Sequence, residues 1–285
     1  MLGSPFSNRI HTMTLDINAY LQRIGFQGDR APTLNTLKAL QQLHLQTITF
    51  ENLNPLLGRA VPLDSPALMD KLIHQRRGGY CFENNLLFLE VLTTLGFQAR
   101  GITGRVYWNQ PEDAWPPRSH MLLLVTIDGE DYLSDVGFGG MTPTAPLQLH
   151  CRDSQRTPLE PFRVDVDQQG YSLWVKVGGP WRLLYRFDLM QQGAVDFEMA
   201  NWYVACHPQS KFVNNLIAVR TGEDRRHTLL NDLYTVRFTD GRSEKHTITS
   251  VAELWDLLQG VFAIDMAGIE RQNLEKVLKE KSLFR

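Results

Sequence analysis

The residues best suited to chemistry lie between Arg76 and Asn85, where a glycine pair precedes a single cysteine. Gly78 and Gly79 permit a tight turn, and the apolar run that begins at Cys81 has the pattern of a helix. At a helix start, unpaired backbone N–H groups and the helix dipole stabilise a thiolate, the reactive form of cysteine. The stretch therefore predicts a nucleophilic thiol, with a small buried hydrophobic side chain as the alternative.

A cysteine nucleophile needs an imidazole to accept its proton and a third group to orient that imidazole. Among the eight histidines, His120 stands at the beginning of an apolar strand, and an Asp-Gly turn at 128–129 folds that strand back onto the next. With a two-residue turn, facing residues have numbers that sum to 257, so Asp135 faces Leu122 and lies diagonally beside His120. An aspartate in an apolar strand is costly unless it is paired. The hairpin therefore predicts a His120–Asp135 hydrogen bond that serves Cys81.

Two other arrangements of these residues remain open. His120 at a strand end and Asp135 beside a turn can be unrelated to Cys81. Alternatively, the three side chains can bind zinc, with water as the fourth ligand. The sequence offers no obvious further ligands or residues to support such a centre, so we expect no metal site.

Glu51 is an acidic residue among apolar neighbours in the segment 48–58. A carboxylate in such surroundings needs a cationic partner, and Arg76 and Arg77 beside the cysteine are the candidates. A solvated loop acid is the alternative. Because Asn and Pro interrupt the segment, we expect an ordered loop there and not a helix.

Helical patterns dominate the chain up to Gly96. Thr14 or Asp16 is the candidate cap of the first helix and Thr33 that of the second, and Asp64 or Ser65 followed by Pro66 is typical of a helix start. Apolar residues recur behind each of these signals with the spacing of amphipathic helices. The predicted helices are 17–24, 34–45, 65–77 and 81–95.

After Gly96 the pattern changes to short runs rich in Val, Leu, Phe, Tyr and Trp that are separated by turn signals. Such runs predict an antiparallel β region in the form of a barrel. The segment 201–208 is expected to lead out of it, and a hairpin turn is expected at 239–242. The predicted strands are 97–108, 120–127, 131–136, 162–166, 171–177, 181–187, 216–220 and 233–238, followed by helices from Ser250 and over 269–281.

The composition is that of a globular protein with a sizeable core, because 43% of the 285 residues are hydrophobic and 21% are charged. A formal net charge of -2 gives no reason to expect nucleic acid or an anionic membrane as a partner. Three cysteines without a CxxC motif argue against a disulfide framework and fit a reducing cytoplasm.

Neither a signal peptide nor a membrane span is indicated. Residues 1–12 lack the apolar core of a signal peptide, and no run of about eighteen apolar residues occurs. We therefore expect a cytoplasmic protein in which 1–12 is a disordered or added tail and Met13 is a candidate start.

Four separated motifs together resemble those of the arylamine N-acetyltransferases and occur in that family's order. A further stretch, which contains Pro208, Ser210 and Phe212, is similar to a fifth motif of the family. The resemblance extends from about Thr14 onward, whereas 1–12 has no counterpart. The four motifs are Phe50–Leu53, Arg77–Glu83, Ser119–Leu123 and Asp135–Gly140, and the fifth is Asn201–Phe212.

The resemblance implies an α+β fold of three parts, of which the first two are arranged as in cysteine proteases and transglutaminases. A helical bundle carrying the cysteine would span 13–96, after the tail at 1–12. A middle antiparallel β-barrel carrying the histidine and the aspartate would span 97–210, and a C-terminal α/β lid would span 211–285. The order of helical and strand patterns along the chain agrees with this division.

The resemblance also implies roles for individual residues. Cys81, His120 and Asp135 match a Cys-His-Asp catalytic triad with no departure from the family's pattern. Glu51 and Arg77 match a buried ion pair that braces the cysteine loop. Positions that line the family's acceptor pocket correspond to Phe50, Val106, Phe138 and Phe212. We expect Gly137 and Gly139 to contact the co-substrate.

The implied activity is the acetylation of arylamines and arylhydrazines, with O-acetylation of N-hydroxyarylamines as a further activity and xenobiotic metabolism as the expected role. Acetyl-CoA is the expected co-substrate, and no cofactor is expected to be tightly bound. The cysteine would carry the acetyl group between two half-reactions, which gives ping-pong kinetics. Aromatic pocket walls suit flat amines, because they supply apolar area and offset stacking.

Two other functions use the same residues. A thiol hydrolase or peptidase would share the triad, but papain-like peptidases have Asn where this chain has Asp135. A binding module that keeps the fold without activity is the second alternative, against which the intact triad argues.

Overall fold

The computed structural model describes residues 15–284, so the predicted tail at 1–12 lies outside the described part of the chain. The first part is helical, as predicted. The Asp16 side chain accepts a hydrogen bond from the N–H of Ala19 at 3.0 Å, and Gly25 ends this first helix with a left-handed φ of 71°. The longer helices of this part share one apolar core and are α1 (Ile17–Ile24), α2 (Leu34–Thr47) and α5 (Cys81–Thr94).

The structure differs from the predicted loop at 48–58. This segment contains the short strand β1 (Phe50–Glu51) and the single-turn helix α3 (Leu53–Leu56). β1 forms because it pairs with a strand from the C-terminal part of the chain, which local sequence does not reveal. The helix predicted at 65–77 begins as α4 (Ser65–Leu68) and continues as the π-helix η1 (Met69–His74).

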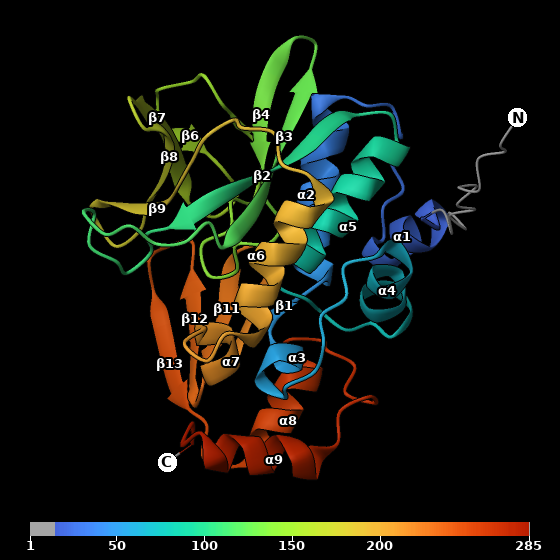
Figure 1. Cartoon of the computed structure of the whole chain (residues 1–285), viewed down its shortest axis with the longest axis vertical. Coiled ribbons are helices and arrows are strands. Elements are labelled where there is room, and N and C mark those ends of the chain that lie inside the picture. The colour runs from blue at the N-terminus through green and yellow to red at the C-terminus, as the bar shows by residue number, and fades with distance from the viewer. Residues whose placement is uncertain (1–14, 285) are drawn as a thin grey trace, which may run out of the picture.

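The second part is a curved antiparallel sheet of eight strands that is nearly closed into a barrel (Figure 1). Its central hairpin pairs Leu123 with Ser134 and Ile127 with Glu130, which confirms the predicted register. Apolar side chains from these strands form a second core. In order across the sheet, the strands are β5 (Leu147–Gln148), β4 (Glu130–Ser134), β3 (His120–Ile127), β2 (Gln98–Val106), β9 (Trp181–Phe187), β8 (Gly170–Lys176), β7 (Pro161–Asp167) and β6 (Gln155–Arg156).

A helix, α6 (Ala194–Cys206), occupies most of the segment that was predicted only to lead out of the barrel. Its helical pattern is weak because apolar side chains lie on opposite faces: Phe197 is buried, whereas Trp202 is 64% exposed. α6 lies across the junction between the curved sheet and the C-terminal part (Figure 1). The short helix α7 (Lys211–Asn214) follows it.

The C-terminal part, which we call the lid, combines a five-stranded antiparallel sheet with two helices around a third apolar core. The N-terminal β1 is an edge strand of this sheet and pairs with β10. β11 and β13 were missed by the sequence analysis because their residues are largely polar: β11 begins Arg-Arg-His, and every residue of β13 is exposed. The elements are β10 (Ile217–Thr221), β11 (Arg225–Leu230), β12 (Leu233–Phe238), β13 (Ser243–Thr247), α8 (Val251–Gly260) and α9 (Arg271–Glu280).

The fold is therefore α+β, with a helical bundle, a barrel-like antiparallel sheet and an α/β lid. Figure 1 shows the N-terminal helices beside the curved sheet and the lid against one end of both. Within residues 15–284, no helix combines the length and the apolar composition that crossing a bilayer requires.

Candidate active site

Cys81 is the first residue of α5, as the glycine pair and the apolar run predict. Its side chain is only 3% exposed, and its Sγ lies 3.7 Å from the carbonyl oxygen of Ser119. Tyr80, the residue before it, is held by the first turn of α5, because the Glu83 carboxylate accepts a hydrogen bond from the N–H of Tyr80 at 3.1 Å. The thiol is thus sheltered and points toward the strand that begins at His120.

His120 and Asp135 form the hydrogen bond that the hairpin predicts. Nε2 of His120 lies 2.8 Å from Oδ2 of Asp135, and both side chains are buried. Burial acts to lower the pKa of His120, but the charge and hydrogen bond of Asp135, together with Cys81, outweigh it and raise the pKa to about 9. The imidazole is therefore held in its protonated form at neutral pH.

Asp135 is fully buried and is fixed by three further donors. It accepts hydrogen bonds from Asn85 Nδ2 at 3.1 Å, from the N–H of Gly137 at 2.8 Å and from the hydroxyl of Tyr185 at 3.0 Å. Burial alone would raise the pKa of this carboxyl group, yet His120 and the hydrogen bonds from Asn85 and Gly137 hold it below its usual value. Sequence reasoning missed Asn85 and Tyr185, although Asn85 follows Cys81 at helical spacing and faces the same side of α5.

A buried network of charges braces the cysteine loop. Glu51 accepts hydrogen bonds from Arg77 Nε and Nη2 at 3.0 and 2.6 Å, so Arg77 is its partner and Arg76 is not. Burial acts to raise the pKa of Glu51, and the charges of Arg77 and Lys71 lower it. Lys71 also forms an ion pair with Glu83 at 2.6 Å, a contact that the sequence analysis did not anticipate.

The loop also pairs with β1 through backbone hydrogen bonds. The N–H of Glu51 donates to the carbonyl of Gly79 at 3.0 Å, and the N–H of Gly79 donates to the carbonyl of Thr49 at 3.2 Å. A Cβ at Gly78 would lie 2.0 Å from the Thr49 carbonyl oxygen, so only glycine fits at this position. The glycine pair thus permits a close backbone approach.

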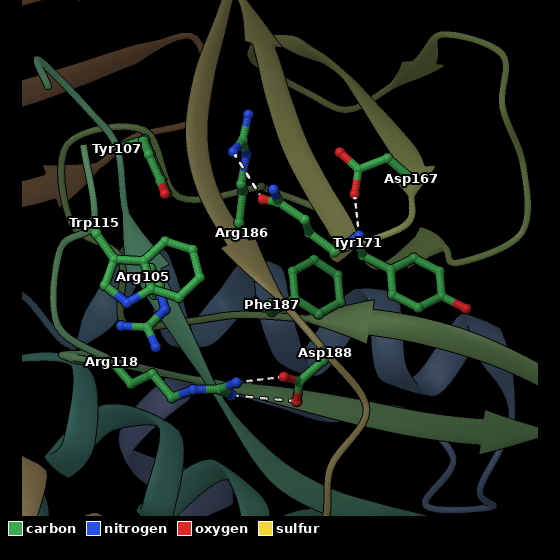
Figure 2. A pocket seen from close by; sticks show the side chains of 10 residues that line it. Arg105, Tyr107, Trp115, Arg118, Asp167, Tyr171, Arg186, Phe187 and Asp188 are labelled. Carbon is green, nitrogen blue, oxygen red and sulfur yellow. Dashed lines mark hydrogen bonds and ion pairs between the residues drawn. The ribbon is translucent and has the colours of Figure 1, made fainter. Parts of the chain in front are cut away.

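The segment that leads into His120 is held from the outer side of the sheet. Figure 2 shows Arg118 facing the carboxylate of Asp188, with which it forms a two-point ion pair. Beside it, the guanidinium of Arg105 lies 4.4 Å from the ring centroid of Trp115 and donates to the carbonyl of Pro116 at 2.6 Å. The side chains that make these contacts line a shallow hollow. Their contacts hold the chain directly before Ser119 in place.

A cavity of about 470 Å³ opens above Cys81, between the curved sheet and the lid. Phe50, Val106, Phe138 and Phe212 all line it, as the resemblance implies. Gly137 lines it as well, but its N–H is already bonded to Asp135. Gly139 is not among the lining residues, and its missing Cβ leaves room for the ring of Phe50. The lid contributes Lys211, Ile217, Val219, Thr228, Leu229, Leu230 and Arg237.

The described residues, 15–284, contain no group of three or more His, Cys, Asp or Glu side chains placed to hold a metal ion. The three cysteines are not joined to one another: Cys81 is buried, Cys151 is partly buried and Cys206 is exposed. The geometry around Cys81 is therefore that of a thiol, an imidazole and an orienting carboxylate.

Comparison with known proteins agrees with this geometry. A family model described as N-acetyltransferase matches residues 33–271. An arylamine N-acetyltransferase of Mycobacterium tuberculosis is 43% identical over 275 residues, which cover 94% of this chain and 96% of the relative. The chain belongs to the arylamine N-acetyltransferase family.

Two other family members extend the comparison. The solved structure of a Mycobacterium marinum arylamine N-acetyltransferase in complex with CoA has a TM-score of 0.90 and 41% identity, and the match covers 93% of this chain and 99% of that one. A relative from Salmonella typhimurium, named arylamine N-acetyltransferase / N-hydroxyarylamine O-acetyltransferase, is 38% identical over 90% of this chain and 92% of its own length. Membership of the arylamine N-acetyltransferase family makes the chain a transferase and confirms the assignment made from its motifs.

Proposed function

We propose that this chain transfers the acetyl group of acetyl-CoA to arylamines and arylhydrazines through an acetyl-Cys81 intermediate. The observation that carries the proposal is the position of Cys81 at the floor of an aromatic-walled cavity, beside a His120–Asp135 pair joined at 2.8 Å. A relative with the same family membership was solved in complex with CoA, which supports acetyl-CoA as co-substrate.

In the first half-reaction, the Cys81 thiolate attacks the thioester carbonyl of acetyl-CoA. The raised pKa of His120 supports this step, because a protonated imidazole stabilises the thiolate and can protonate the leaving sulfur of CoA. The backbone N–H of Cys81 donates to the developing oxyanion in this proposal, since Cys81 is the first residue of α5 and the first N–H groups of a helix have no partner within it. Expulsion of the CoA thiol leaves acetyl-Cys81 and a neutral His120.

In the second half-reaction, the amine nitrogen attacks the acetyl-Cys81 carbonyl while His120 accepts its proton. Collapse of the tetrahedral intermediate releases the acetylated amine and restores the thiolate–imidazolium pair. Asp135 keeps Nε2 of His120 occupied, so that Nδ1 is the nitrogen that exchanges protons. The rings of Phe50, Phe138 and Phe212 supply the apolar walls for a flat acceptor.

The finer assignments follow the same reasoning. We infer that Gly137 forms part of the floor beneath the acyl donor, while Gly139 acts indirectly by admitting the ring of Phe50. The name of the Salmonella typhimurium relative supports O-acetylation of N-hydroxyarylamines as a further activity, because an N-hydroxy oxygen can replace the amine as second nucleophile. A cytoplasmic location and a role in xenobiotic metabolism complete the proposal.

Intact-protein mass spectrometry tests the mechanism directly. Mixing the protein with acetyl-CoA alone should add one acetyl group, which peptide mapping places on Cys81, and an arylamine added afterwards should remove it as acetylated amine. Cys81→Ser should give no thioester adduct. Absence of an adduct on Cys81 of the unmodified protein would sink the mechanism, and decay at equal rates with and without amine would instead identify a hydrolase.

A further inference from the structure

A buried hydrogen-bond network crosses the helical bundle and ends at the loop before Cys81. The hydroxyl of Tyr20, on α1, lies 3.0 Å from Nδ1 of His44, on α2. Nε2 of His44 lies 3.2 Å from Oδ1 of Asn84, on α5, and Nδ2 of Asn84 lies 2.6 Å from the carbonyl oxygen of Gly79. The three side chains are fully buried, and none of them lines the cavity.

The carbonyl group at one end of the network determines which group donates at every step. Because the Gly79 oxygen can only accept, the Asn84 amide turns its NH2 group to it and its oxygen to His44. His44 then donates from Nε2, and its Nδ1 accepts from the hydroxyl of Tyr20. Burial lowers the pKa of His44 to about 4, so the imidazole is neutral and can both donate and accept. All donors thus point from α1 toward the cysteine loop, and each hydrogen bond polarises the next.

The peptide unit between Gly79 and Tyr80 is held on both of its sides. Its carbonyl accepts from Asn84 Nδ2 and from the N–H of Glu51, at 2.6 and 3.0 Å, and its N–H donates to the Glu83 carboxylate at 3.1 Å. A backbone at glycine rotates more freely than at other residues, so this peptide would turn easily without such contacts. The amide of Asn84 is the contact that comes from the interior of the bundle.

The next peptide unit carries the N–H of Cys81, the donor that the proposed mechanism directs at the oxyanion. The carbonyl of this unit belongs to Tyr80 and accepts from the backbone N–H of Asn84 at 3.0 Å. Asn84 therefore binds both peptide units that precede the nucleophile, the first through its side chain and the second through its backbone. A shift of about 1 Å at a reacting centre can cost about 10²-fold in rate.

We propose that Asn84, held by His44 and Tyr20, is a positioning residue that directs the N–H of Cys81 toward the acetyl oxygen during acylation. This role rests on the proposed acetyl transfer and adds to it a determinant inside the helical bundle. It concerns the oxyanion and not the thiolate, which the imidazole of His120 stabilises. Loss of the Asn84 amide therefore slows attack on a thioester carbonyl and leaves the thiol equally reactive toward other electrophiles.

Two reactions of Cys81 distinguish these effects. Acetyl-CoA acylates the thiol through an oxyanion, whereas iodoacetamide alkylates it by direct displacement of iodide and needs only the thiolate. The measured quantity is the ratio of the two rate constants at neutral pH, from released CoA and from peptide mapping of alkylated Cys81. Asn84→Leu should lower this ratio about tenfold, because loss of an oxyanion donor costs about 10²- to 10³-fold and a misdirected donor loses part of that.

His44→Gln and His44→Asn form a matched pair of polar variants. The amide of glutamine extends to the position of Nε2 and can donate to Asn84, so the ratio should stay close to that of the unmodified protein. The shorter asparagine does not reach Asn84, so the ratio should fall as in Asn84→Leu. This pair decides the question if circular dichroism shows that Asn84→Leu does not fold.

A role of the network in the fold alone predicts a different result. The variants would then unfold at lower denaturant concentration, while the two rate constants would stay the same or fall together. An unchanged ratio in folded Asn84→Leu or in His44→Asn would therefore overturn the positioning role and leave acetyl transfer intact. Failure of the unmodified protein to release CoA from acetyl-CoA would overturn the proposed function and this inference with it.

Discussion

The protonated state of His120 links the chemistry of the site to the stability of the fold. Its pKa of about 9 in the folded protein lies above the value of about 6.5 expected in the unfolded chain. A raised folded pKa contributes stability that is fully present below pH ~6.5 and is lost as pH rises through ~9. The same proton that prepares the thiolate therefore also stabilises the folded state.

We expect this contribution to appear as a pH-dependent difference in the free energy of unfolding between the unmodified protein and His120→Gln. The difference should be larger at pH 6 than at pH 9.5 by about 3 kcal/mol, as two pKa values about 2.5 apart imply. Urea unfolding at the two pH values measures it. An equal difference at both pH values for His120→Gln would contradict the raised pKa.

Asp135→Asn tests whether the carboxylate orients His120 or only maintains the fold. Asparagine can still accept the hydrogen bond from the Gly137 N–H through its amide oxygen, and its NH2 group can donate to the hydroxyl of Tyr185, so we expect the circular dichroism spectrum to stay the same. The rate of acetyl transfer should fall by about 10³- to 10⁴-fold, because the imidazole loses its charge partner and its tautomer is no longer fixed. Asp131→Asn, in β4 and outside the cavity, should keep the rate. An unfolded Asp135→Asn protein would contradict an orienting role.

At the scale of elements, the start of α5 is positioned by close backbone contact with the loop after β4. A Cβ at Gly137 would lie 2.7 Å from the Cα of Cys81 and 2.8 Å from its carbonyl oxygen. Backbone atoms in the first turn of a helix cannot move as a flexible side chain can. The loop after β4 can therefore lie this close to the start of α5 only because residue 137 has no side-chain methyl group.

Gly137→Ala should therefore displace Cys81 from His120. We expect a loss of about 2–3 kcal/mol in the free energy of unfolding, together with a slower acetyl-CoA half-reaction measured by the burst of released CoA. Gly140→Ala is the matched control, because a Cβ there has no atom within 4 Å, and its stability should change by less than about 0.5 kcal/mol. Equal free energies of unfolding for the two variants would show that a Cβ at residue 137 can be accommodated without displacing Cys81.

The elements that carry Cys81, His120 and Asp135 were predictable because their signals are local. The Asp-Gly turn fixes the register of β3 and β4, and the register in turn places Asp135 beside His120. The start of α5 at Cys81 could likewise be predicted from Gly78, Gly79 and the apolar run that follows them. The apolar neighbours of Glu51 predicted a partner at Arg76 or Arg77, and the family motifs selected Arg77. The roles of the aromatic pocket residues came from the family motifs alone, since these residues lie far apart in the sequence.

The remaining features were not predictable because they depend on tertiary contacts. β1 has only two residues and exists through its pairing with β10. α6 carries apolar residues on opposite faces because it spans a junction between two parts of the molecule. Tyr185 looks like any strand tyrosine until the fold brings its hydroxyl to Asp135.

At the scale of the whole molecule, Arg226 joins the lid to the curved sheet. Its side chain is 1% exposed, and its Nη2 lies 2.8 Å from Glu160 Oε2 and 3.0 Å from the carbonyl oxygen of Thr142. Arg226 belongs to β11, whereas Glu160 and Thr142 belong to loops of the barrel region. This contact helps to hold the lid residues that line the cavity above Cys81.

Arg226→Met should lower the free energy of unfolding by about 3–5 kcal/mol, because it leaves Glu160 as an unpaired charge in a largely buried position. Adding Glu160→Gln to this variant should recover part of the loss. Arg225→Met, which removes an exposed ion pair with Asp224 one residue away, should leave the free energy of unfolding almost unchanged, because water screens this pair. Chemical denaturation measures the free energy of unfolding of the three variants. Similar losses for Arg226→Met and Arg225→Met would show that Arg226 does not hold the lid to the curved sheet.

The pairing of β1 with β10 also bears on how the protein is made. Phe50 and Glu51 find their partners, Val219 and Ala218, only after most of the chain has been synthesised. When the helices and the barrel have left the ribosome, β1 can already pair with the loop before Cys81, but it has no strand on its other side until β10 has been made. The enzyme would become reactive only near the end of translation, and truncated products would carry the cysteine without its completed surroundings.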